Sequence, residues 1–305
     1  MKKKYFNNLM IEPTNICNLK CPVCPSGEGF YNDESRGIMG IKQFRAIVDS
    51  SREFVESINL WGFGEPFLAP DIIKMIDYLG ENNILINVHT NGNILSKKML
   101  NAFRKNHRIS ITFSIDGLTQ KTYSYYRRGG YLKEALNNLS YLVNLKNKHD
   151  LFNLEIIWQF LINKGNEHEV LYIKEVANNI GTDKLLLKTI GINKKHSRYN
   201  DFIPENKDYW REKGKIVNPR TCGFINPGTP TISWDGDVVA CCHDFSKRYV
   251  MGNAFKESLL DIWHNDGYRK FRSDYRKGIN DMCNTGCKFT KKSKVYVKEF
   301  NFSIN

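Results

Sequence analysis

The sequence lacks any apolar run long enough for a membrane span or a secretory signal. The basic start is followed only by the short run LMI at Leu9 to Ile11, far below what either segment needs. We therefore expect a cytoplasmic protein with no membrane partner. Dense Lys/Arg blocks, internal repeats and low-complexity stretches are also missing. The lack of dense Lys/Arg blocks argues against a nucleic-acid partner despite a net charge of +13.

Cysteine is absent from the whole centre of the chain. All eight cysteines fall into an early group ending at Cys24 and a late group beginning at Cys222. Disulfides are rare in a reducing cytosol, and clustered cysteines there more often bind metal. The two groups thus predict two metal sites.

From Leu9 to Ile190, strand and helix patterns alternate. Such alternation predicts an α/β fold with a parallel sheet, and six units approach a partial (β/α)6 TIM-like barrel followed by a small α+β module. The expected domains are residues 1–195 for the barrel, 196–220 for a polar connector and 221–305 for the second module. Functional residues are expected at the strand C-termini. The predicted strands are Leu9 to Glu12, Ile58 to Trp61, Leu85 to His89, Ile109 to Ile115, Leu154 to Leu161 and Lys184 to Ile190.

The early cysteines have the spacing C-x3-C-x2-C, with Cys17, Cys21 and Cys24 directly after the first predicted strand. Three thiolates in so tight a loop can hold a 4Fe-4S cluster and leave one iron open. A zinc site or three unrelated core thiols are the alternatives, although zinc normally takes four ligands. An open iron can chelate the amino and carboxylate groups of methionine. At these residues the sequence resembles the radical S-adenosylmethionine (SAM) superfamily.

The resemblance continues at the ends of later strands. Within GFGEP, Gly64 and Glu65 match the family's segment that binds the methionyl amino group. Asn91 in HTNG, and Ser114 and Asp116 in SIDG, match positions near ribose or substrate. For Asn91 and Asp116 a structural role is an equal alternative, because Asn-Gly and Asp-Gly are ordinary turn dipeptides.

A basic segment follows these strand ends. The segment YRRGG also resembles the family, and Arg127 or Arg128 within it could pair with a carboxylate of cofactor or substrate through a bidentate fork.

The late cysteines resemble the auxiliary iron-sulfur module called SPASM, or its shorter relative called twitch. Cys222 and Cys241 enclose a probable hairpin turn at Trp234 to Gly236, and Cys283 and Cys287 form a late pair. The resemblance implies that these four cysteines hold one auxiliary 4Fe-4S cluster. A structural zinc with the same ligands is the competing interpretation.

Cys242 is left over from this ligand set. On a strand it would face away from Cys241, so the two could serve one cluster only if the chain turned there. Cys242 is either a hydrogen-atom donor, which would make the protein an epimerase, or a small buried apolar side chain.

The resemblance implies reductive cleavage of SAM to a 5'-deoxyadenosyl radical that removes hydrogen from a substrate. An auxiliary cluster can then take up an electron, which favours a net oxidation, a dehydrogenation by an oxidoreductase. A small polar metabolite such as a sugar or an aminocyclitol is preferred over a peptide, since little chain precedes Cys17 for a peptide-recognition domain. A peptide maturase and a non-catalytic electron carrier are the alternatives. The basic charge predicts an acidic flavodoxin or ferredoxin as electron donor.

Overall fold

The computed structural model describes residues 6–192, 196–210, 215–216, 222–285, 294–295 and 297–302. These residues form two compact units, each built from separated stretches of the chain. Unit 1 comprises residues 1–16, 31–87 and 217–293, and unit 2 comprises residues 17–30, 88–216 and 294–305. Strand β3 (Leu85–Thr90) passes from the first unit into the second. The predicted domains, residues 1–195, 196–220 and 221–305, have different boundaries from these two units, and that division stays a prediction.

Unit 1 contains strands in the order β10-β9-β8-β1-β2. Strand β1 lies parallel to β2 on one side and to β8 on the other, with Met10 opposite both Asn59 and Thr231. A late strand therefore pairs with the strand that leads into the early cysteines. The bounds are β1 (Asn8–Ile11), β2 (Ser57–Leu60), β8 (Thr231–Ile232), β9 (Asp237–Val239) and β10 (Val250–Asn253).

A tight turn joins β8 and β9, which are antiparallel. Gly236 has φ +88 and donates its N–H to the Ser233 carbonyl at 2.9 Å. Glycine suits this left-handed backbone because it has no side chain to clash. The hairpin turn predicted at Trp234 to Gly236 is confirmed.

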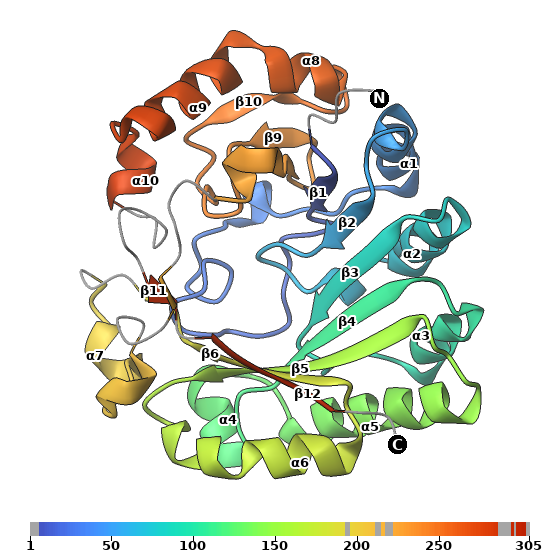
Figure 1. Cartoon of the computed structure of the whole chain (residues 1–305), viewed down its shortest axis with the longest axis vertical. Coiled ribbons are helices and arrows are strands. Elements are labelled where there is room, and N and C mark those ends of the chain that lie inside the picture. The colour runs from blue at the N-terminus through green and yellow to red at the C-terminus, as the bar shows by residue number, and fades with distance from the viewer. Residues whose placement is uncertain are drawn as a thin grey trace. The chain divides into compact units, whose positions relative to one another are not determined.

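The helices of unit 1 each bury one apolar face. In α8 the buried side chains include Trp263, whose ring lies 5.4 Å from that of Phe6 near the chain start. Figure 1 shows α8 and α9 beside strands β9 and β10. The bounds are α1 (Ile41–Ser51), α2 (Ile72–Glu81), α8 (Leu259–His264), α9 (Asp266–Lys277) and α10 (Asp281–Thr285).

Unit 2 is built around three parallel strands, β4 (Ile109–Ser114), β5 (Leu154–Ile162) and β6 (Lys184–Thr189). Strand β12 (Val297–Asn301) pairs antiparallel with the free edge of β6. Figure 1 shows α4, α5 and α6 along one face of these strands. The remaining bounds are α3 (Lys97–Ala102), α4 (Gln120–Tyr126), α5 (Leu132–Lys148), α6 (Ile173–Ile180), α7 (Tyr199–Phe202), β7 (Lys215–Ile216) and β11 (Lys294–Val295).

All six predicted strands are present, within a residue or two of their expected ends. Gly181 ends α6 in the left-handed conformation, which glycine adopts without a side-chain clash. Helix α4 was not predicted, because its residues QKTYSYY carry no apolar stripe. The α/β class is as expected.

Candidate active site

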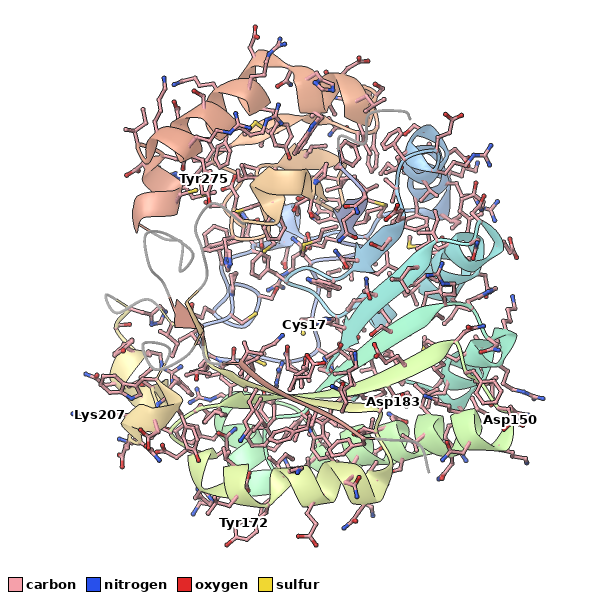
Figure 2. All side chains as sticks on the ribbon, in the orientation of Figure 1. Cys17, Asp150, Tyr172, Asp183, Lys207 and Tyr275 are labelled. Atoms are coloured by element: carbon pink, nitrogen blue, oxygen red, sulfur yellow. The ribbon has the colours of Figure 1, made fainter. Side chains whose placement is uncertain are left out.

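The early cysteines lie on one loop that follows β1, and Figure 2 marks Cys17 on it. Backbone N–H groups point at the sulfurs. Leu19 donates to Cys17 Sγ at 3.4 Å, and the N–H groups of Gly27 and Ser26 bond Cys24. Such N–H donors stabilise a thiolate and tune an iron-sulfur cluster held by it.

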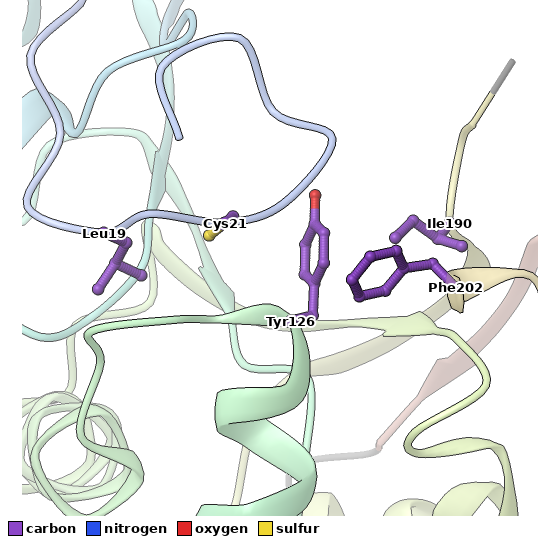
Figure 3. Close-up of a cluster of buried hydrophobic side chains, with 5 residues drawn as sticks. All are labelled: Leu19, Cys21, Tyr126, Ile190 and Phe202. Atoms are coloured by element: carbon purple, nitrogen blue, oxygen red, sulfur yellow. The ribbon is translucent and has the colours of Figure 1, made fainter. Parts of the chain in front are cut away.

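Cys21 occupies a buried apolar patch with Leu19, Tyr126, Ile190 and Phe202. Figure 3 shows the Tyr126 ring standing between Cys21 and the side chains of Ile190 and Phe202. Burial raises the pKa of the Cys21 thiol to about 12, so without a metal the thiol form dominates at neutral pH. A bound metal would hold it as thiolate.

Cys17 and Cys24 pack against the same patch. Within the described ranges, no three His, Cys, Asp or Glu side chains are gathered closely enough to hold a metal. The donor types nevertheless fit a three-thiolate cluster, because all three sulfurs adjoin one patch and two receive backbone N–H bonds.

The GFGEP segment is fitted closely to the chain just before Cys17. A Cβ on Gly64 would lie 2.1 Å from the Thr14 carbonyl oxygen, so no side chain can be placed there. The next residue, Glu65, is buried and donates its backbone N–H to the Ile16 carbonyl at 2.8 Å. Glycine at position 64 thus lets this loop approach residues 14–16, which lead into the cysteine loop.

Arg127 and Asp116 form a buried ion pair, with Arg127 Nε donating to Asp116 Oδ2 at 2.6 Å. The other carboxylate oxygen of Asp116 accepts the N–H of Leu161 at 2.7 Å. Burial lowers the pKa of Arg127, but Asp116 and Cys21 together raise that pKa by more, so it lies well above its ordinary value. The observed role of Asp116 is to fix a charged arginine near the early cysteines. A direct contact of Asp116 with ribose or substrate stays a prediction.

Asn91 lies at the end of β3 beside the cysteine loop. Its Nδ2 donates to Asn18 Oδ1 at 2.9 Å and reaches Cys17 Sγ at 4.0 Å. Ser114, the last residue of β4, is buried and accepts a bond from Gln159 Nε2 at 3.4 Å. The described structure therefore brings Asn91 and Arg127 toward the cysteines, while Ser114 lies in a separate polar row.

The late cysteines that the structure describes, Cys222, Cys241, Cys242 and Cys283, are in unit 1. Cys222 accepts bonds from the N–H groups of Phe224 and Ile225. Cys241 and Cys283 are both buried. Cys287 lies outside the described residues, so the four-cysteine ligand set stays a prediction.

The chain turns at Cys241, because β9 ends at Val239 and the Asp244 N–H bonds the Cys241 carbonyl at 3.0 Å. The alternation expected of a strand therefore does not apply to Cys241 and Cys242. The backbone therefore does not place the two sulfurs on opposite faces of a strand, and Cys242 is a candidate cluster ligand as well as a candidate hydrogen donor.

Two domain families match the chain. Residues 11–155 match the Radical SAM superfamily, and residues 222–288 match the iron-sulfur cluster-binding domain SPASM. The chain is a member of the radical SAM superfamily and carries a C-terminal SPASM domain. Its cofactors are accordingly 4Fe-4S clusters and SAM, which disfavours zinc at either site.

Similar proteins share this organisation at low identity. A tungsten-containing aldehyde ferredoxin oxidoreductase cofactor-modifying protein from Pyrococcus furiosus is 23% identical, over 94% of this chain and 90% of its own length. The structure of Streptococcus suis SuiB bound to S-adenosylmethionine is 18% identical with a TM-score of 0.71, over 88% of this chain and 68% of SuiB. BtrN in complex with AdoMet and 2-DOIA is 17% identical with a TM-score of 0.57, over 98% and 100%. These likenesses support the partial (β/α)6 barrel followed by a small module.

Sequence reasoning overlooked Gln159 and Lys188, whose side chains form a polar row with Ser114. The available signal was the pattern KLLLKT in β6, which places Lys184, Leu186 and Lys188 on one face. No described helix combines the length and apolar character that a membrane crossing requires.

Proposed function

We propose that this radical SAM enzyme dehydrogenates a small polar metabolite, such as a sugar or an aminocyclitol. The observation that carries the proposal is the loop of Cys17, Cys21 and Cys24 beside Arg127, a fixed cation able to pair with a carboxylate. On one-electron reduction, the cluster-bound SAM supplies methionine and the 5'-deoxyadenosyl radical. The protein's own residues hold the cofactor and exclude water, so that the radical meets one bond.

The net oxidation balances with the second cluster as electron acceptor. The 5'-deoxyadenosyl radical would take one substrate hydrogen atom and become 5'-deoxyadenosine. The substrate radical would then lose a proton to water and an electron to the auxiliary cluster. Cys222, Cys241, Cys283 and Cys287 are the proposed ligands of that cluster. The proposed location is the cytoplasm. An acidic flavodoxin or ferredoxin is the proposed electron donor, since the chain carries 45 Lys and Arg against 32 Asp and Glu.

Anaerobic cluster reconstitution tests the proposal, with iron and sulfide counting and an assay for 5'-deoxyadenosine after dithionite reduction. We expect about eight irons per chain in the wild type. With Cys17, Cys21 and Cys24 all changed to Ala, we expect about four irons and no nucleoside. Release of no nucleoside by the fully loaded wild type would favour an electron carrier instead.

A peptide maturase is the second candidate function, because Streptococcus suis SuiB, whose fold resembles this chain, was also solved with a bound precursor peptide, SuiA. Substrate mass separates the candidates. A dehydrogenase removes two hydrogens from a small molecule, whereas a maturase modifies a peptide.

The third candidate, an epimerase, would leave the substrate mass unchanged in water and introduce one solvent deuterium in deuterium oxide. Cys242→Ala should abolish that deuterium incorporation, while 5'-deoxyadenosine, which depends on Cys17, Cys21 and Cys24, is still released.

A further inference from the structure

A row of hydrogen-bonded polar side chains crosses the three central strands of unit 2. Ser114 on β4 pairs in register with Gln159 on β5, and Leu161 pairs with Lys188 on β6. Because residues opposite each other or two apart share a face, all three polar side chains emerge on one side. Gln159 Nε2 donates to Ser114 Oγ at 3.4 Å, and Lys188 Nζ donates to Gln159 Oε1 at 2.8 Å.

Lys188 differs from the other sheltered cations of unit 2. Arg127 has Asp116 at 2.6 Å, Lys146 has Asp183 at 2.6 Å, and Lys184 has Glu155 at 2.7 Å. Figure 2 marks Asp183. In the described part of the chain, the one polar partner of the Lys188 ammonium is the neutral amide oxygen of Gln159. A sheltered ammonium without a carboxylate is costly to maintain.

The electrostatics around Lys188 point the same way. Burial lowers the pKa of Lys188, and only Glu299, on the neighbouring strand β12, raises it from a distance. Burial, together with Lys188 and Arg127, lowers the pKa of His89 to about 3, so that imidazole is neutral. Within the described residues, Glu299 acts on the Lys188 ammonium only through space and no carboxylate bonds to it directly, so an incoming anion would balance this charge.

The polar row lies near the C-terminal ends of strands β4 and β6. Ser114 is the last residue of β4, and Lys188 is the last but one of β6. In barrels of parallel strands, ligands bind at the C-terminal strand ends. The row therefore lies at the end of the strands where a substrate belongs.

We propose that Lys188, supported by Gln159 and Ser114, binds an anionic group of the substrate, a carboxylate or a phosphate. This inference rests on the proposed function and narrows the polar metabolite to one that carries negative charge. Lys188 would hold the anion while a bond elsewhere in the substrate faces the radical.

The test measures anion binding directly on the reconstituted holoenzyme, by calorimetry at low ionic strength. The probes are inorganic phosphate and acetate. Lys188→Met removes the charge and keeps most of the length, Lys188→Arg keeps the charge, and Lys184→Met is the matched control on the same face of the same strand. Urea unfolding of each variant establishes that it folds.

We expect saturable binding of at least one probe by the wild type, weakened about tenfold to hundredfold in Lys188→Met, as for a lost charged hydrogen bond. Lys188→Arg and Lys184→Met should bind within about threefold of the wild type, which is less than 1 kcal/mol. The tighter probe identifies the substrate group as phosphate or carboxylate.

Three results would overturn the inference. The first is a lack of saturable binding with both probes, and the second is an equal loss of binding in Lys184→Met and Lys188→Met. The third is competitive displacement of the probe by SAM, which would assign Lys188 to the cofactor's carboxylate. Release of 5'-deoxyadenosine by the wild type, assayed in parallel without probe, reports the proposed function separately, so either claim can fail alone.

Discussion

Among the described residues, Asp116 is the one carboxylate that pairs with Arg127, so its removal should have a measurable effect. Asp116→Asn leaves the guanidinium charged and buried without its counter-ion, beside the patch that contains Cys21. Removing one partner of a buried pair costs about 3–5 kcal/mol. We expect a fall of that size in the free energy of unfolding measured in urea, with weaker SAM binding by calorimetry.

The matched control is Asp201→Asn, which breaks the exposed pair with Arg198. An exposed pair contributes at most about 1 kcal/mol. Equal losses of stability in the two variants would contradict the view that Asp116 is a special anchor.

Glu12 is a buried carboxyl in unit 1, five residues before Cys17. Burial raises its pKa to about 7, although the Phe63 N–H, at 2.7 Å from Oε1, and Lys247 favour the charged form. The folded state thus binds a proton that the unfolded chain has lost above pH about 4.5. The stabilisation from Glu12 is therefore fully present below pH about 4.5 and is lost as pH rises through about 7.

Glu12→Gln imitates the protonated acid at every pH and keeps an oxygen for the Phe63 N–H. The difference in unfolding free energy between variant and wild type should therefore grow with pH, in favour of the variant. It should reach about 3 kcal/mol at most near pH 8. Urea unfolding of both holoproteins between about pH 5 and pH 8 measures it. A pH-independent difference would show that Glu12 titrates alike in both states.

At the scale of elements, strands with apolar patterns were predictable and short polar helices were not. The six predicted strands follow from runs such as LEIIWQFLI, which bury both faces. Helix α4 is specified by its cap, because Thr119 and Thr122 bond each other's backbone N–H groups in a capping box. The site was predictable where a motif spacing carried it, as at Cys17, but not at Lys188, whose environment arises from strand register.

The cap of α4 provides a test of how an element positions a side chain. Thr119→Ala should cost about 1 kcal/mol of stability and weaken SAM binding, since Arg127 directly follows α4. Ser96→Ala removes a similar cap from α3, where the Ser96 side chain accepts the Met99 N–H. This control should lose similar stability in urea but bind SAM normally. Equal effects on SAM binding would argue against a link between the cap and Arg127.

At the scale of the whole molecule, the net charge of +13 should govern the encounter with an acidic electron donor. The Debye length is about 10 Å at 0.1 M salt and shortens as salt rises, which screens attraction between the two surfaces. Turnover supported by flavodoxin, followed as 5'-deoxyadenosine formed at donor concentrations below saturation, should therefore fall as salt increases. Dithionite, a small reductant that needs no docking, is the control and should support a rate that changes much less. If both rates respond alike, the surface charge does not guide the donor, and local features of the docking face must do so instead.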